Sequence, residues 1–168
     1  MPIISTDIQY RLSGGASNTD VNASLGGAKS STSIGAGLHN LFDIVSSAES
    51  SAGDTEYRCF YIHNNHGSLT MQSAKIWIAT NTPSADTSVE IALGSSAVNG
   101  TEQTVANENT APTGVTFSAP ASEGAALSIG DIPAGQHKAV WIKRIVNAGA
   151  AAYNSDGATI TVKCDTAA

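Results

Sequence analysis

Histidine and cysteine side chains are the first candidates for chemistry in this sequence, because both can bind a metal ion. Two asparagines separate His63 from His66, and Cys59 lies on the His63 side of the strand that we expect here. A zinc site needs three or four ligands that converge. The segment from Asn64 to Gly67 is also a typical turn, because asparagine and glycine tolerate positive φ angles. We therefore interpret these residues as a turn and predict no metal ligand.

Acidic side chains suggest two further kinds of site. Asp54 and Glu56 lie on one side of the same segment, like the carboxyl pair of a glycosidase, but such a pair needs a cleft and a fixed separation. Acids in loops could bind calcium, which takes several oxygen ligands. The loop acids are Asp86, Glu90, Glu102, Glu108 and Asp131. No Asp-x-Asp-x-Asp-Gly pattern supports a calcium site, and we expect solvated acids rather than a catalytic pair.

Other motifs that carry chemistry are absent from the sequence. It contains no Gly-x-Ser-x-Gly, no phosphate-binding Gly-Lys-Ser loop and no Cys-x-x-Cys. Trp77 and Trp141 could form a platform for a sugar if both were exposed, but each lies within a strand beside isoleucine, which favours burial or an interface. The sequence predicts no catalytic residue, no cofactor and no enzymatic activity.

The elements that would position these residues are short strands joined by turns. Segments such as Thr159–Lys163 alternate apolar and polar residues, and no segment has a helical period of 3.6. We therefore predict an all-β fold of about seven to nine strands in two packed antiparallel sheets. On the last strand, Ile160, Val162 and Cys164 share the face that we expect to be buried. The predicted strands are 8–12, 38–45, 55–63, 69–79, 88–93, 115–117, 127–129, 136–146 and 158–164.

The domain organisation follows from a change in composition near residue 38. Residues 16–37 are mostly Gly, Ser, Ala and Asn, and the Gly14-Gly15 and Gly26-Gly27 pairs are typical of linkers. We predict that residues 1–37 form a flexible N-terminal arm, which would become ordered on contact with neighbouring molecules. Residues 38–168 are predicted to form the β-sandwich domain.

Charge and hydropathy exclude several classes of partner. The 168 residues include 14 acidic and 8 basic ones, a formal net charge of −6, and no basic stripe is present, so we expect no nucleic-acid partner. No apolar run reaches the roughly 20 residues of a membrane span, and no secretory signal is visible, so we expect no membrane partner and synthesis in a cytoplasm. In that setting Cys59 and Cys164 are expected to be reduced thiols.

Residues 55–164 resemble immunoglobulin-like sandwich modules. The resemblance rests on a strand that ends in Asn64-Asn65-His66-Gly67, and on Ile132-Pro133-Ala134-Gly135-Gln136 before a strand that contains Val140-Trp141-Ile142. It implies that the sandwich is immunoglobulin-like. The Gly/Ser-rich segment before residue 38 and the long 94–114 connection depart from a strict immunoglobulin pattern.

The stretch 99–117, together with Trp141-Ile142-Lys143-Arg144, resembles small virion structural proteins of tailed bacteriophages. This resemblance implies a non-enzymatic protein of the virion that decorates or cements the outside of the capsid. Its partners would be the major capsid protein or other virion proteins, and it would be a homo-oligomer or present in many copies. An immunoglobulin-like tail or adsorption module is the alternative, and a carbohydrate-binding β-sandwich is a further one.

Overall fold

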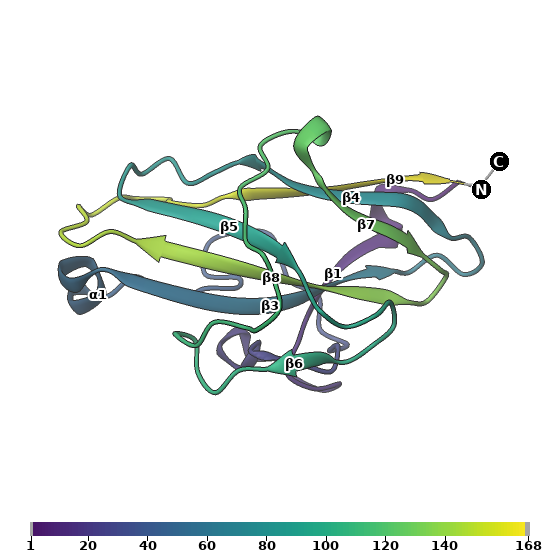
Figure 1. Cartoon of the computed structure of the whole chain (residues 1–168), viewed down its shortest axis with the longest axis horizontal. Coiled ribbons are helices and arrows are strands. Elements are labelled where there is room, and N and C mark those ends of the chain that lie inside the picture. Colours follow the sequence, from purple (N-terminus) through teal and green to yellow (C-terminus); the bar gives the residue numbers. More distant parts are fainter. Residues whose placement is uncertain (1, 167–168) are drawn as a thin grey trace.

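The computed structural model describes residues 2–166, and most of them lie in strands or in the connections between strands (Figure 1). The single α-helix among them, α1 (Ser47–Ala52), begins with a capping box between Ser46 and Glu49. The strands are β1 (Ile8–Leu12), β2 (Gly26–Gly27), β3 (Asp54–Asn64), β4 (Met71–Thr80), β5 (Thr87–Leu93), β6 (Glu102–Thr104), β7 (Leu127–Ile132), β8 (His137–Val146) and β9 (Thr159–Thr166).

The strands form two main antiparallel sheets and a small ribbon. The first sheet has the order β1-β3-β8-β5, the second has the order β7-β4-β9, and β2 pairs with β6. All pairings between strands are antiparallel. The prediction of an all-β sandwich from alternating segments is therefore confirmed.

The main core lies between the two sheets. Alternate residues of β3 and β8, such as Phe60, Ile62 and Val140, meet Ile76 and Ile78 of β4 there. Ile160, Val162 and Cys164 of β9 pack against this core as partly buried residues, as the alternation of the last strand predicts. Each buried aliphatic side chain contributes about 1.5–3 kcal/mol through the hydrophobic effect.

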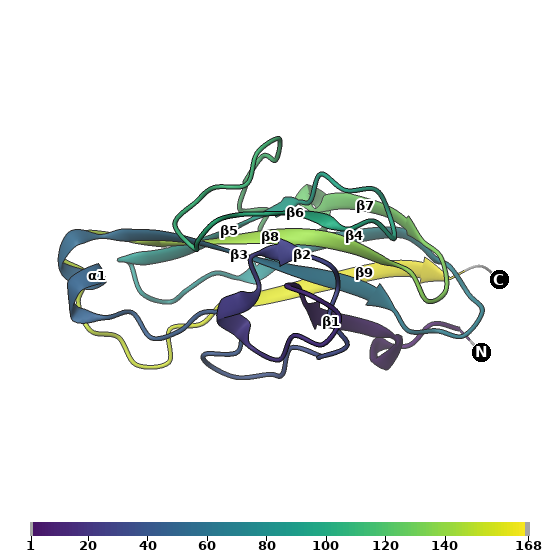
Figure 2. The same ribbon diagram turned by 90° about the horizontal axis from the view of Figure 1, so that it is seen from below.

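A second, smaller core covers the outer face of the four-stranded sheet. Cys59, Tyr61 and Trp141 are fully buried there under Val105 and Phe117 from the 95–118 segment. Figure 1 shows β6 on the side of this sheet that faces away from β4 and β9, and Figure 2 views the molecule from that side. The fold therefore has three layers: the β7-β4-β9 sheet, the β1-β3-β8-β5 sheet in the middle, and a covering layer that contains the β2–β6 ribbon.

Residues 1–37, which the sequence predicts to be a flexible arm, contain parts of this fold. β1 pairs along its whole length with the end of β3. The segment after it packs on the outer face, where the backbone N–H of Cys59 donates to the carbonyl of Ser24 at 2.8 Å and the hydroxyl of Ser13 donates to the carbonyl of Cys59 at 2.9 Å. The expected boundary at residue 37 thus does not separate an arm from the sandwich in this structure.

Two of the predicted strands are wrong. Residues 38–45 form an irregular loop, in which His39 has a φ of 56°. Residues 115–117 form no strand either, and only the neighbouring Ser118 makes an isolated bridge to Ile91. Both segments are apolar because they cover a core from outside the sheets, which requires apolar side chains but no strand pairing.

None of the helices in residues 2–166 has the length and apolar character that crossing a membrane requires.

Candidate functional site

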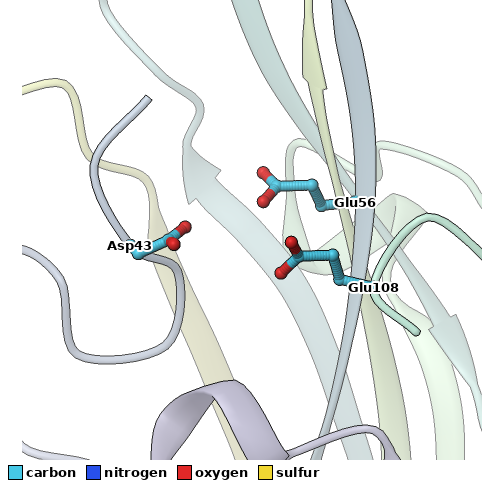
Figure 3. A group of neighbouring side chains, drawn as sticks. All are labelled: Asp43, Glu56 and Glu108. Atoms are coloured by element: carbon cyan, nitrogen blue, oxygen red, sulfur yellow. The ribbon is translucent and has the colours of Figure 1, made fainter. Parts of the chain in front are cut away.

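Five charged side chains gather on the inner face of the four-stranded sheet, near the end that carries α1. This ion-pair cluster consists of Asp43, Glu56, Arg58, Glu108 and Arg144. β3 supplies Glu56 and Arg58, β8 supplies Arg144, and two loops supply the other two acids. Figure 3 shows the three carboxylates directed toward a common space. Segments far apart in the sequence therefore build one charged cluster.

The arginines connect the acids of the cluster. Arg58 is fully buried and lies 2.5 Å from a carboxylate oxygen of Glu108. Arg144 pairs with the buried carboxylate of Glu56, and it also donates to the backbone carbonyl of Asp43 at 2.6 Å. The ring of Phe42 lies against both guanidinium groups, with centroid distances of 5.5 and 4.9 Å. The cluster thus holds the 38–45 loop against the sheet.

The geometry of the carboxylates also resembles a cation site. One oxygen from each of Asp43, Glu56 and Glu108 lies within 4.8 Å of the others. However, both arginines already bond to these acids, and a divalent cation would be repelled by them. Burial raises the pKa of Glu56 although Arg144 acts to lower it, and the Oε1 atom of Glu56 has no hydrogen-bond partner. We therefore assign the cluster a structural role.

The histidine and cysteine residues considered as metal ligands do not converge. Cys59 lies under the outer layer, where burial raises the pKa of its thiol. His66 accepts hydrogen bonds from the backbone N–H groups of Ser68 and Leu69 through Nδ1, so its ring closes the turn. Within residues 2–166, wherever three potential metal-ligating side chains lie close together, all three are carboxylates. Cys59 and Cys164 are both free thiols.

The acids that suggested a carboxyl pair or a calcium site have separate partners. The structure brings Asp54 and Glu56 together, since one oxygen of each lies within 4.8 Å of the other and of an oxygen of Glu49. However, Asp54 accepts from the Asn109 amide, and Glu56 pairs with Arg144 in the ion-pair cluster. The loop acids are spread over the molecule: Glu90 pairs with Lys143, Glu108 pairs with Arg58, Asp86 accepts from the backbone of Ala151, and Asp131 accepts from the backbone of Ser73. Glu102 is buried beside Ser95 and Ser96. They do not form one calcium loop.

The two tryptophans do not form a common platform. Trp141 is fully buried in the outer core of the first sheet. Trp77 is half-buried and lies on β4 of the second sheet, between the core residues Ile76 and Ile78, so it points away from the main core. The prediction that the tryptophans are buried or lie in an interface is therefore confirmed for Trp141, which is buried.

Exposed apolar side chains gather at the end of the sandwich that carries α1. Among residues 2–166, the large apolar residues that are strongly exposed are Ile4, Leu38, Ile44 and Tyr153. Three of them, Leu38, Ile44 and Tyr153, line one cleft of about 1140 Å³, and we call these three residues the apolar end. The cleft continues inward between the sheets to Phe60, Ile142 and Ile160.

Sequence reasoning missed both the ion-pair cluster and the apolar end. Glu56 and Arg144 are 88 positions apart, and no local pattern indicates that they pair. Residues 38–45 did contain a signal for the apolar end, because His39, Asn40 and Asp43 interrupt the apolar residues of this segment. This interruption disfavours a buried strand and is typical of a loop that exposes part of its apolar surface.

The comparisons with known proteins give no match. No protein family matches the chain, and no curated protein and no solved structure is significantly similar to it.

Proposed function

We propose that this chain is a non-enzymatic virion structural protein that decorates or cements the outside of a bacteriophage head. The observation that carries the proposal is the apolar end, where Ile44 is 70% exposed and Leu38 and Tyr153 are about half exposed around one cleft. Large apolar side chains that are exposed around a cleft are typical of a site that binds another protein. The resemblance of residues 99–117 to small virion proteins supports a partner in the virion, and we propose the major capsid protein.

The ion-pair cluster supports an adhesive role for this surface. Arg144 bonds to Asp43, the residue next to Ile44, and Phe42 packs on the same arginine. The loop that exposes Ile44 is therefore held in one conformation before a partner arrives. A surface that is ordered in advance loses less conformational entropy on binding.

Many copies of a modest interface would suffice for the proposed role. Each copy that binds only the assembled shell shifts the equilibrium toward assembly by mass action. Contacts repeated over symmetry-related sites add avidity without any new type of contact. A protein without a catalytic site can therefore stabilise a particle, and the proposed location of this chain is the virion.

Co-sedimentation with bacteriophage particles that lack this protein tests the proposal. Purified protein is mixed in parallel with isolated heads and with isolated tails, and the bound copies per particle are measured as its concentration rises. Saturation on heads at a fixed number of copies is the expected result. Saturation on tails alone would replace the proposal with the tail or adsorption module. Binding to neither, together with binding on a glycan array, would replace it with the carbohydrate-binding sandwich.

A further inference from the structure

A group of basic side chains lies on the outer face of the first sheet, at the end opposite α1. The register places His63 of β3 directly opposite His137 of β8, and Arg11 of β1 lies opposite Tyr61 of β3. These residues therefore occupy adjacent rows on one face, where the rings of Tyr61 and His137 meet edge to face at 4.9 Å. We call Arg11, Lys29, His63 and His137 the basic row. In Figure 1 it lies where β3 ends and β8 begins, at the right.

The members of the basic row are close enough to repel one another. Burial lowers the pKa of both His63 and His137, and the charge of Lys29 lowers each pKa further. Burial and then the charge of Arg11 lower the pKa of Lys29. All four side chains are partly exposed. The four groups therefore lie near one another and are partly exposed, in a chain whose net charge is −6.

No acidic side chain of residues 2–166 forms an ion pair with the basic row. The ion pairs of this part of the chain use Arg58, Lys143, Arg144 and Lys163. Instead, Arg11 donates to the carbonyl of Ser31 and to Gln9, and Lys29 lies 3.4 Å from the carbonyl of Ser30. The positive charge of the row is thus not neutralised within the molecule.

The acids of the surrounding elements are bonded elsewhere. Asp7, just before β1, accepts from the backbone N–H of Ile4 at 2.9 Å. Glu102 of β6 accepts from Ser95 and Ser96, and its charge acts on Lys138, which donates to the carbonyl of Gly94 at 3.0 Å. On β3, His63 Nδ1 lies 3.1 Å from the carbonyl of Gln136, and on β8 the His137 ring contacts the backbone of Gly100, while its Nδ1 atom is buried without a hydrogen-bond partner.

We propose that the basic row is a docking site for an acidic, carboxylate-rich segment of a partner protein, and that binding becomes tighter as the pH falls. Charge complementarity is the argument: a carboxylate placed between Arg11 and Lys29 relieves their repulsion and gains charge-assisted hydrogen bonds. Protonation of His63 and His137 adds two positive charges to the same surface. The row lies away from the apolar end, so this proposal does not depend on the proposed function.

An acidic protein segment fits this surface better than a nucleic acid does. The row is short, and the remaining basic side chains are paired with acids, hydrogen-bonded to carbonyls or located on the second sheet. A nucleic-acid backbone requires a continuous basic track with stacking aromatics, and the net charge of −6 would repel it. A few carboxylates on a flexible segment require only a local basic surface.

Fluorescence anisotropy with a labelled oligo-aspartate peptide tests the proposal at low salt, since aspartate stays ionised at about pH 5.5. The full chain is compared with Lys29→Gln and with Lys75→Gln, which removes a lysine from β4 on the other sheet. We expect saturable binding that is about two- to fivefold weaker in Lys29→Gln and unchanged in Lys75→Gln. Because the pKa of both histidines lies below 6.5, binding should tighten mainly as the pH falls from about 6.5 to 5.5, and His63→Gln should reduce this gain.

Several outcomes would overturn the proposal. These are the absence of saturable binding, an equal loss of affinity in both lysine variants, and affinity that does not rise at lower pH. Binding of a DNA oligonucleotide without binding of the peptide would also reject the acidic protein partner. Circular dichroism checks that each variant is folded. If His63→Gln does not fold, the two lysine variants and the pH series of the unmodified chain decide whether the proposal holds.

Discussion

Arg144 connects more parts of the candidate site than any other side chain we describe. It pairs with the buried carboxylate of Glu56, bonds to Asp43 and lies under the ring of Phe42. Removal of one partner from a buried ion pair leaves a charge without compensation, which costs far more than the pair itself contributes. The neighbouring Lys143 pairs with Glu90 at a more exposed position, where such pairs contribute little.

Arg144→Met should therefore lower the free energy of unfolding by about 3 kcal/mol. The matched substitution Lys143→Met, one position earlier on the same strand, should cost less than about 1 kcal/mol. Urea denaturation followed by tryptophan fluorescence measures both values. Equal losses in the two variants would contradict the role that we assign to the ion-pair cluster.

Glu102 makes the stability of the protein depend on acidic pH. Its burial acts to raise its pKa, but hydrogen bonds from the backbone of Ser96 and the hydroxyl of Ser95 outweigh this and lower the pKa to about 2. An acid whose folded pKa lies below its unfolded value of 4.5 stabilises the fold above that value. This contribution is lost as the pH falls from 4.5 toward 2.

Glu102→Gln should lower stability by about 3 kcal/mol near pH 7, which corresponds to the shift in pKa. The difference from the unmodified protein should become smaller as the pH falls through this window. Thermal or urea unfolding at a series of pH values measures the difference. A difference that stays constant down to about pH 2 would show that Glu102 is not the group responsible.

The sequence identified several of these charged residues without their partners. Asp54 and Glu56 were expected to be solvated, because exposed acids before a strand usually are, and Glu108 was considered only as one of the loop acids. The structure pairs Glu108 with Arg58 over 50 positions and Glu56 with Arg144 over 88 positions. Such pairs depend on which strands are neighbours in a sheet, and alternation along one segment contains no information on that order.

Strands that alternate apolar and polar residues were predictable, whereas the layer that covers the first sheet was not. The segments that became β1, β5 and β9 alternate, whereas those that became β3 and β4 were recognised by their aromatic and β-branched residues on either side of a turn. The Gly/Ser-rich segment before residue 38 was interpreted as flexible because its composition is typical of linkers. Small residues also allow two backbones to approach closely, and composition alone does not distinguish these two uses.

Gly26 illustrates such a close approach. It has a φ of +94°, and a Cβ atom added there would lie 1.8 Å from the carbonyl oxygen of Gln103 on β6. Gly26→Ala should therefore separate β2 from β6 and lower the free energy of unfolding by at least about 2 kcal/mol. Gly67→Ala is the control, since nothing lies within 4 Å of its added Cβ and its φ is not positive. Chemical denaturation compares the two variants, and similar small effects would contradict the packed position of residues 13–33.

Considered as a whole, the molecule has two different ends on one long sandwich (Figure 1). The end that carries α1 exposes Leu38, Ile44 and Tyr153 around the cleft, and the opposite end carries the basic row. Two sheets with a main core and a second core on the outer face form a stable support for both surfaces. We propose that these two surfaces bind partners, and we expect the layers between them to supply the stability.

The central claim is that the apolar end attaches the protein to a bacteriophage head. Co-sedimentation with heads that lack the protein tests it most directly when Ile44→Ser is compared with Ile4→Ser. Both isoleucines are exposed, at 70% and 54%, but Ile4 lies outside the apolar end. We expect saturable binding that is about tenfold weaker for Ile44→Ser, as at an interface hot spot, and unchanged for Ile4→Ser. Equal binding of both variants, or no binding of the unmodified protein, would contradict the claim.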